Sequence, residues 1–402
     1  MKKLMIMGAG IYQVPLIRRA REMGIYTIVV SIPGPYPGFE CADEVCYINT
    51  VDQEAVLAVA REKKIDGIVT AGTDVAVITI GRVCEELSLA GPSLKAAQTA
   101  TDKFLMKQCF EKAGVRTAKF RQILIDEDPY EKIKDLRYPL IVKAVDSSGS
   151  RGITRVTGKE QIPAAIESVR KVTRRPYYLI EEFITGIDYG VQAFVSGGKI
   201  RFILPHGNDM FFGDTGVPAG HYVPYDMSSA ALKDLEQTVT AAIEAMGLDN
   251  CAVNGDLILC GDETYIVEMT ARSGATGLSE IDSVYLGCDL YENIILTALR
   301  EEPVFPADPP KTACAGRLLR SDVTGTVVSV RNGNVGEDPR IIQMVLDYGP
   351  GDHVNAFHVG PDRIGQVIAR GNTLEEARQT VEEAIDKISF NISPDEGGNT
   401  CL

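Results

Sequence analysis

Two carboxylates, Asp256 and Glu268, stand twelve positions apart in a segment of two apolar stretches that meet at Gly261-Asp262. The stretches, 251–259 and 264–269, are typical of two paired strands. A bulge or an odd loop would place the carboxylates side by side on one sheet face, whereas a two-residue turn would leave them solvated on opposite faces. Like charges opposite each other are destabilising, so a side-by-side pair requires a cation. Mg²⁺ suits that role, because it usually takes one or two carboxylates plus phosphate oxygens.

A lysine followed by a loop of small residues forms a second signal. Lys143 lies at the end of an apolar run, 139–143, and the loop that follows reads Ser147-Ser148-Gly149-Ser150-Arg151-Gly152. Backbone N–H groups of such a loop can close over phosphate oxygens. The loop is not a Walker A motif, and a hairpin loop with a surface lysine is the alternative interpretation.

A third signal lies at the end of the apolar stretch 177–182. Glu181 and Glu182 end that stretch, and Asp188 follows after a turn. Such a segment can present backbone groups to an adenine edge and a carboxylate to ribose hydroxyls. Taken alone, it is equally typical of an ordinary strand end.

The first glycine-rich turn, Gly8-Ala9-Gly10, follows the apolar strand 3–7. The third glycine of the dinucleotide fingerprint is replaced by Gln13, and no acidic residue ends the next strand, 26–31. The turn therefore indicates tight packing rather than a dinucleotide site.

Composition limits the classes of partner. The chain has 402 residues, a formal net charge of −14 and a pI near 4.9, which disfavours nucleic acid or an anionic membrane as partner. Nine cysteines without a CxxC motif argue against a disulfide framework or a zinc ribbon. The N-terminal apolar run is too short for a signal peptide, and no run reaches the length of a membrane span. We expect a cytoplasmic protein of two to three domains.

Strands and helices alternate over the first hundred residues, which predicts a parallel sheet. A helix is expected to begin near Thr101, with Thr101 as its cap, and to end before Gly114. The proline-rich stretch 301–310 is interpreted as a linker. Short strands and one helix, 373–388, follow it.

Together, the order and spacing of these signals resemble the ATP-grasp ligases. The matching features are Lys103 near a helix start, Lys143, the glycine-serine loop, the Glu-Glu-Phe-Ile segment and the carboxylate pair, and the stretch 362–377 resembles the family's C-terminal domain. The resemblance implies a mixed α/β and α+β fold. It would comprise an N-terminal parallel α/β pre-ATP-grasp domain (1–100), an ATP-grasp domain (101–310) with a mobile subdomain at about 118–184, and a small β-rich C-terminal domain (311–402).

The resemblance also implies a role for each site residue, with ATP and Mg²⁺ bound and Mn²⁺ as an alternative ion. The ATP phosphates would be contacted by Lys103, Lys143, Ser147, Ser148, Gly149, Ser150 and Gly152. Adenine would be bound by Glu181, Glu182, Phe183 and Ile184, and the ribose by Asp188. Asp256 and Glu268 would bind the metal, and Arg272 would contact the phosphoryl group in transfer.

Two local features indicate the substrate side. The family often has Glu-x-Asn-x-Arg after the second metal strand, but here Thr270 replaces the asparagine, which puts a second metal ion in doubt. The turn Gly220-His221-Tyr222-Val223-Pro224 resembles one in the L-amino acid ligase branch, so His221 is expected to contact substrate. The turn after Arg272, with Ser273 and Gly274, would receive a substrate carboxylate through backbone N–H groups, unless it is a plain connection to the next helix.

The implied function is an ATP-dependent, ADP-forming carboxylate–amine ligase that works through an acyl phosphate, with an amino acid or a related small carboxylate as substrate. Its partners would be a small carboxylate and an amine, and a homodimer is the expected assembly. Two alternatives stay open. One is a bicarbonate-using enzyme that resembles carbamoyl-phosphate synthases or purine-biosynthesis carboxylases. The other is an ATP-binding protein without turnover.

Overall fold

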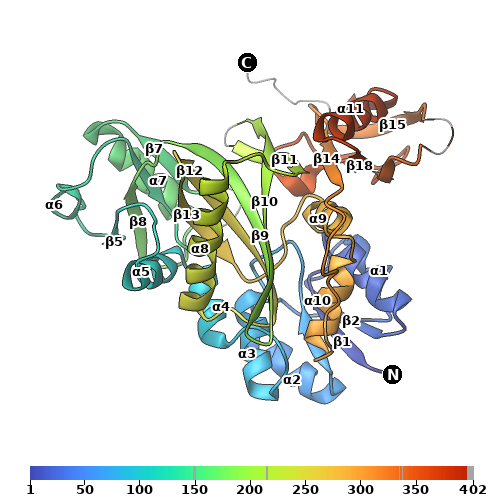
Figure 1. Ribbon diagram of the computed structural model, residues 1–402, viewed down its shortest axis with the longest axis horizontal. Helices are drawn as coiled ribbons and strands as arrows, with labels where there is room; N and C mark the ends of the chain where they lie inside the picture. The colour runs from blue at the N-terminus through green and yellow to red at the C-terminus, as the bar shows by residue number, and fades with distance from the viewer. Residues whose placement is uncertain (148–150, 214–215, 335, 337, 396–402) are drawn as a thin grey trace. The chain divides into compact units, whose positions relative to one another are not determined.

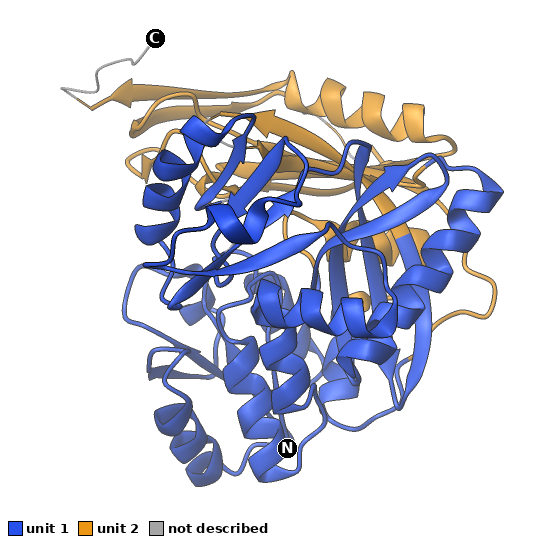
Figure 2. Ribbon diagram, turned by 90° about the vertical axis from the view of Figure 1, so that its left-hand side faces the viewer, with its two compact units in different colours: residues 1–204, 226–273, 291–303 blue, residues 205–225, 274–290, 304–402 orange. Residues whose placement is uncertain are grey.

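The computed structural model of the chain describes residues 1–147, 151–213, 216–334, 336 and 338–395. The chain forms two compact units, coloured separately in Figure 2. Unit 1 comprises residues 1–204, 226–273 and 291–303, and unit 2 comprises residues 205–225, 274–290 and 304–402. Both units are therefore assembled from segments far apart in the sequence.

Unit 1 begins with a four-stranded parallel sheet in the order β3-β2-β1-β4 (Figure 1). Its strands and nearby helices are β1 (Lys3–Met7), α1 (Val14–Glu22), β2 (Tyr26–Ser31), β3 (Glu44–Tyr47), α2 (Gln53–Lys63), β4 (Gly67–Val69) and α3 (Val77–Leu87). Side chains of β1 and β2 share one buried core with α2 and α3. The parallel sheet predicted from the alternation of strands and helices is confirmed.

Helices α4 (Leu94–Thr101) and α5 (Lys103–Ala113) lead out of this sheet. The expected cap at Thr101 is wrong, because Thr101 is the last residue of α4 and its hydroxyl bonds to the Ala97 carbonyl. Asp102 caps α5 instead, accepting the N–H groups of Phe104 and Leu105 at 2.9 and 3.2 Å. The new cap makes Lys103 the first residue of α5.

A second, antiparallel sheet in unit 1 has the order β5-β8-β6-β7. Its elements are β5 (Phe120–Leu124), α6 (Tyr130–Ile133), β6 (Leu140–Lys143), β7 (Ile153–Val156), α7 (Ile162–Arg170) and β8 (Tyr177–Glu182). Apolar residues of α7 pack on β6 and β8 in a separate core. Because β6 and β8 are adjacent, Lys143 and Glu181 lie on neighbouring strands.

The third part of unit 1 holds the carboxylate hairpin. Strands β13, β12 and β9 lie side by side and are antiparallel. The elements are β9 (Ile187–Ser196), the first half of β10 (Lys199–Phe212), α8 (Ser229–Met246), β12 (Cys251–Cys260), β13 (Glu263–Thr270) and most of α10 (Leu290–Ala298).

Unit 2 is built mainly of antiparallel strands. The end of β10 pairs with β11, followed by β14, β18 and β16, while β17, β15 and β19 form a small separate sheet. Its elements are β11 (Gly216–Val223), α9 (Leu278–Leu286), β14 (Ala313–Leu319), β15 (Gly325–Asn332), β16 (Ile341–Leu346), β17 (His353–Val354), β18 (Gly365–Gly371), α11 (Leu374–Ile385) and β19 (Ile388–Pro394). Helix α11 buries Ala377 and Val381 against β14 and β18. The expected β-rich C-terminal region is confirmed.

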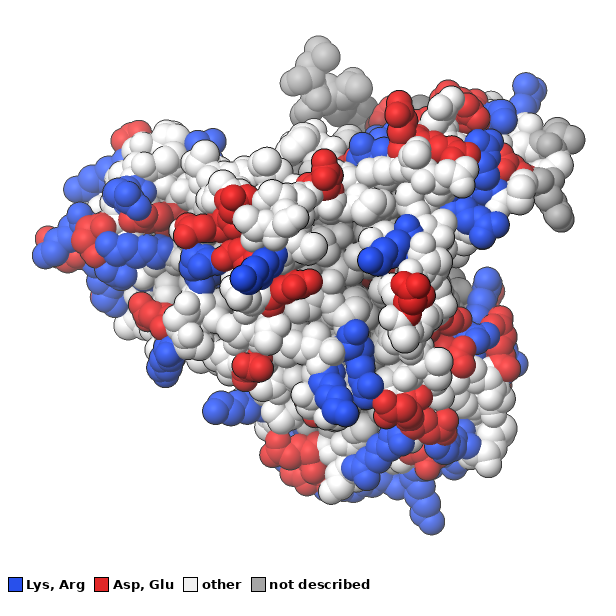
Figure 3. Space-filling view, viewed as in Figure 1, with Lys and Arg blue, Asp and Glu red and all other residues white. Residues whose placement is uncertain are grey.

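On the face drawn in Figure 3, acidic and basic side chains lie intermixed, with a broad area of uncharged side chains between them. The net charge of −14 is therefore not gathered in one acidic patch on that face. Among the described helices, none combines the length and the apolar character that a membrane span requires.

Candidate active site

The hairpin of β12 and β13 brings Asp256 and Glu268 directly opposite each other. The turn at Gly261-Asp262 has two residues, which by itself would pair Asp256 with Val267. The register shifts beyond Leu257 and Ile266, so Val267 is the extra residue of a β-bulge. The sequence left a bulge and a two-residue turn as competing interpretations. The structure has both the two-residue turn and the bulge, and the bulge brings the two carboxylates opposite each other.

The two carboxylates experience opposite electrostatic environments. Glu268 accepts a hydrogen bond from the Nζ of Lys103 at 2.9 Å. Asp256 keeps contact with solvent, yet desolvation by surrounding protein and the charges of Glu268 and Asp188 raise its pKa to about 7. Two adjacent carboxylates, of which Asp256 has a raised pKa, fit a divalent cation, and the sequence analysis predicts that cation from the same pair.

A buried ion triad lies beside the hairpin, on α5 and the second sheet. Glu181 accepts from Lys143 at 2.6 Å and from Lys107 at 2.7 Å, and each of the three side chains is at most 6% exposed. Burial and the neighbouring Lys143 lower the pKa of Lys107 to about 8. Although burial alone would raise it, the two lysines hold the pKa of Glu181 below its ordinary range. The triad has one more positive than negative charge, as an anion site requires.

Lys103 joins the carboxylate hairpin to the small-residue loop. Besides Glu268, its Nζ donates to the Ser147 carbonyl at 2.8 Å. Lys103, Ser147 and Glu268 line a cavity of about 500 Å³, together with Asp74 and Arg151. That volume is in the range of small-molecule sites.

The small-residue loop is described at both ends. Ser147 donates its hydroxyl to the Arg151 carbonyl at 2.7 Å, and the Gly152 carbonyl accepts from Ala144 N at 3.0 Å. Gly152 has φ +67° and lies against Val172. The other predicted phosphate contacts, Ser148, Gly149 and Ser150, lie outside the described residues.

The predicted nucleotide-base segment, 181–184, comprises the last two residues of β8 and the two residues after it. Glu182 forms an ion pair with Arg137 at 2.8 Å, and the Phe183 ring lies 4.3 Å below the Arg155 guanidinium. Ile184 follows in the same irregular stretch, and its side chain is half-buried. The predicted ribose residue, Asp188, is exposed on β9 two residues from Gly190, the strand neighbour of Asp256.

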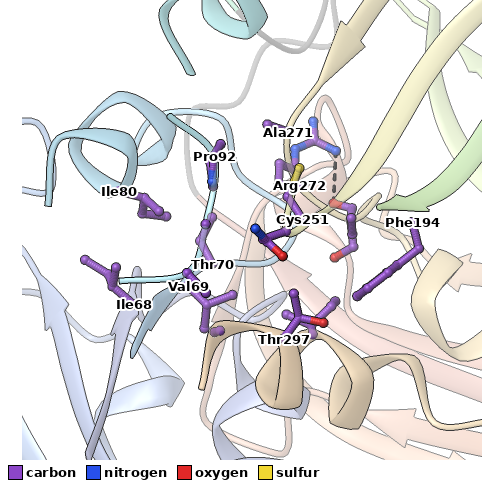
Figure 4. Close-up of a pocket in the computed structure, with 17 residues that line it drawn as sticks. Ile68, Val69, Thr70, Ile80, Pro92, Phe194, Cys251, Ala271, Arg272 and Thr297 are labelled. Carbon is purple, nitrogen blue, oxygen red and sulfur yellow. Dashed lines mark hydrogen bonds between the residues drawn. The ribbon is translucent and has the colours of Figure 1, made fainter. Parts of the chain in front are cut away.

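Arg272 follows β13 and is held by a carboxylate that the sequence did not single out. Its Nε and Nη2 donate to the two oxygens of Asp74, both at 2.8 Å, and its Nη1 donates to the Ser273 carbonyl at 3.1 Å. Behind it lies a small cavity with mainly apolar walls, including Ile68 and Phe194 (Figure 4). Ser273 is fully buried, and Gly274 is the first residue of the next segment of unit 2.

His221 lies on β11 in unit 2, in a buried group of polar side chains. Its Nδ1 lies 2.9 Å from Asn208 Oδ1, and its ring meets His206 edge-on with centroids 5.1 Å apart. Burial and the neighbouring His206 hold the pKa of His221 well below its ordinary value, and burial lowers that of His206 to about 4. Both rings are therefore neutral near pH 7.

Sequence reasoning missed Lys107 and Asp74. Lys107 follows Lys103 by four residues, a spacing that puts both on one helix face, so its position could have been inferred. Asp74 has no such signal, because it is 198 positions from the arginine it binds.

The residues present fit a nucleotide and a divalent ion. Lys103, Lys107, Lys143 and Arg272 supply four cationic groups, and the hairpin supplies two carboxylates as hard oxygen donors. Catalysis of phosphoryl transfer consists mainly of positioning and charge neutralisation by such groups. The site is therefore of the phosphoryl-transfer type.

Comparison with known proteins agrees with this chemistry. Residues 100–276 match the ATP-grasp domain family, and residues 317–393 match the L-amino acid ligase C-terminal domain 2. A crystal structure of phosphoribosylglycinamide synthetase from Anaerococcus prevotii is 31% identical, with a TM-score of 0.84 over 98% of this chain and 100% of that one. The chain belongs to the ATP-grasp superfamily. Its C-terminal segment relates it to the L-amino acid ligase branch.

Two curated relatives show how far the similarity extends. Alanine–anticapsin ligase from Bacillus subtilis (strain 168) is 25% identical over 274 residues, which make up 61% of this chain but only 57% of that protein. Formate-dependent phosphoribosylglycinamide formyltransferase from Actinobacillus pleuropneumoniae serotype 3 (strain JL03) is 24% identical over 401 residues, 97% of each chain. The predicted family and fold are confirmed.

Proposed function

We propose that the protein is an ATP-dependent, ADP-forming ligase that joins a small carboxylate to an amine. The observation that carries this proposal is the register of the hairpin, which sets Asp256 opposite Glu268 with Lys103 bonded to the latter. In this site, ATP would lie among Lys103, Lys143 and the 147–152 loop, with its base near 181–184 and its ribose near Asp188. Asp256 and Glu268 would hold Mg²⁺ or Mn²⁺, which when bound neutralises phosphate oxygens.

The reaction would take place in two steps. First, a carboxylate oxygen attacks the γ-phosphorus of ATP, an acyl phosphate forms, and ADP leaves with the electrons of the broken P–O bond. In this step, Arg272 and Lys143 would stabilise the negative charge on the phosphoryl group in transfer. Second, the amine nitrogen attacks the acyl carbon, the C–O bond breaks, phosphate leaves and the nitrogen releases a proton. In the resting protein, the ion pair with Glu181 at 2.6 Å holds the buried Lys143 side chain in place.

The amino acid ligase relatives favour an amino acid as the carboxylate, with His221, Arg272, Ser273 and Gly274 on the substrate side. The relatives that match end to end make formate the second candidate. We further propose that the expected three-domain division and a homodimeric assembly apply to this chain.

The test is release of ADP and phosphate from MgATP with amino acids, formate or bicarbonate, each with and without an amine. Hydroxylamine added with the acid alone would trap an acyl phosphate as a hydroxamate. We expect one acid to give both ADP and hydroxamate, and Glu268→Gln to lower the rate at least about a hundredfold. Glu263→Gln, an exposed carboxylate on the same strand, is the matched control and should change nothing. Release that depends only on bicarbonate would refute the proposal.

A further inference from the structure

We propose that Asp74, in the loop between β4 and α3, is a positioning residue that fixes the guanidinium of Arg272 for phosphoryl transfer. The inference rests on the phosphoryl-transfer role that the proposed function gives to Arg272. Asp74 belongs to the parallel-sheet part of unit 1, far in sequence from the hairpin. It would make that part of the protein a component of the catalytic centre and not only a support for it.

Asp74 and Arg272 form a bidentate ion pair. Each oxygen of Asp74 accepts one N–H of Arg272 at 2.8 Å, so the carboxylate fixes the plane of the guanidinium as well as its position. The Arg272 side chain is 13% exposed, and that of Asp74 is 21% exposed. Although burial alone would raise it, Arg272 and Thr270 hold the pKa of Asp74 below its ordinary range.

Asp74 is itself held by the segment that carries Arg272. The hydroxyl of Thr270 donates to Asp74 Oδ1 at 2.6 Å, and Gly72 N donates to the Ser273 carbonyl at 3.2 Å. The Asp74 carbonyl accepts from Val77 N at the start of α3. The loop is therefore hydrogen-bonded to the segment 270–273 at two points, Gly72 and Asp74. The Asp74 carboxylate cannot shift without breaking several of these hydrogen bonds.

This arrangement gives Thr270 a function. The residue that departs from the family's asparagine is 2% exposed and uses its hydroxyl proton on Asp74. The Asp74 carboxylate therefore accepts three side-chain hydrogen bonds, two from Arg272 and one from Thr270. A misplacement of about 1 Å in a catalytic group can cost about a hundredfold in rate, so a fixed guanidinium matters for turnover.

A double-mutant cycle tests the inference, because two residues that act through one group are not additive. The proteins are wild type, Asp74→Asn, Arg272→Gln and the double variant. The readout is the affinity for MgADP with and without aluminium fluoride, which mimics a phosphoryl group in transfer and needs no acid or amine substrate. ADP release is measured in parallel wherever a substrate pair is found.

We expect Asp74→Asn to lower the tightening by aluminium fluoride about 10- to 100-fold while MgADP alone binds within about twofold of wild type. In the Arg272→Gln background, Asp74→Asn should cost nothing more. Asp135→Asn, which removes an exposed carboxylate paired with Arg121 and Lys119, is the control and should match wild type. Thr270→Val should show a smaller loss, also absent in the Arg272→Gln background, and it remains informative if Asp74→Asn does not fold.

Additive losses would overturn the inference, as would a wild type that aluminium fluoride does not tighten. If Asp74→Asn raised only the KM for the amine, Asp74 would be a substrate-binding group, and this result would also overturn the inference. Absence of ADP release with every substrate pair, combined with a non-additive cycle, would refute the proposed ligase reaction and leave the role of Asp74 intact.

Discussion

Replacing Glu181 with glutamine removes the one negative charge between two buried lysines. Lys107 and Lys143 are 1% and 2% exposed, so neither ammonium group can recover its hydration by a small movement. Glutamine keeps the shape of the side chain and offers one carbonyl oxygen in place of a charged carboxylate. The perturbation is therefore electrostatic, with little change in packing.

The expected loss follows from the cost of leaving buried charges without a partner. Breaking a buried ion pair by removing one member costs about 3–5 kcal/mol. For a chain of this size, about 2 °C of melting temperature is lost per kcal/mol, which gives a decrease of roughly 6–10 °C. Because the phosphates of ATP would supply the missing negative charge, the decrease should become smaller in saturating MgATP.

Thermal unfolding of the ligand-free protein and of the MgATP complex, followed by fluorescence, measures both effects. Asp135→Asn is the control, since the Asp135 side chain is 47% exposed, its ion-pair partners Lys119 and Arg121 are also accessible, and it lies outside the proposed nucleotide site. An exposed pair contributes about 0–1 kcal/mol, so the control should lose no more than about 2 °C. A loss for Glu181→Gln no larger than that of the control would refute the electrostatic account of the triad.

Four further outcomes are expected. Since Asp256 has a pKa of about 7, protons should compete with the metal, and Mn²⁺ affinity measured by paramagnetic resonance should fall up to about tenfold per pH unit below pH 7, a dependence that Asp256→Asn should abolish. Gly152→Ala should weaken ATP binding in calorimetry, because a Cβ at φ +67° would meet Val172 Cγ2 at 2.3 Å. His221→Ala should raise the KM for the acid at least about tenfold with ATP affinity unchanged, whereas an unaltered KM would remove it from the substrate site. Burial raises the pKa of Asp282 well above its ordinary value, so the folded protein loses stability as pH rises from the unfolded pKa towards the folded one. Asp282→Asn should accordingly raise the melting temperature at pH 8 and have little effect near pH 4.

The sequence predicted the parallel sheet, the carboxylate pair and the strand lysine because each depends on local patterns. The exact pairing of Asp256 with Glu268 was not decided by the sequence, since both a bulge and a regular register fit the same residues. The start of α5 was misplaced by one residue because Thr101 and Asp102 are both good caps, and the preceding helix takes Thr101.

Contacts between distant segments were beyond sequence reasoning. The four-residue spacing puts Lys107 on the same helix face as Lys103, but its pairing with Glu181 on β8 exists only in the tertiary structure. Asp74 becomes a partner of Arg272 only when the first sheet and the hairpin have packed together. Both contacts depend on tertiary structure, which cannot be predicted from helix and strand propensities or from the spacing of apolar residues.

The bulge at Val267 also bears on how related chains should be aligned. With a two-residue turn, a regular ladder sets the partner of position 256 eleven residues later, and one extra residue moves that partner to position 268. A relative whose carboxylates are eleven apart can therefore build the same pair with a regular hairpin. A gap of one residue between such sequences belongs inside the second strand, and placing it in the turn would match residues that face opposite sides of the sheet.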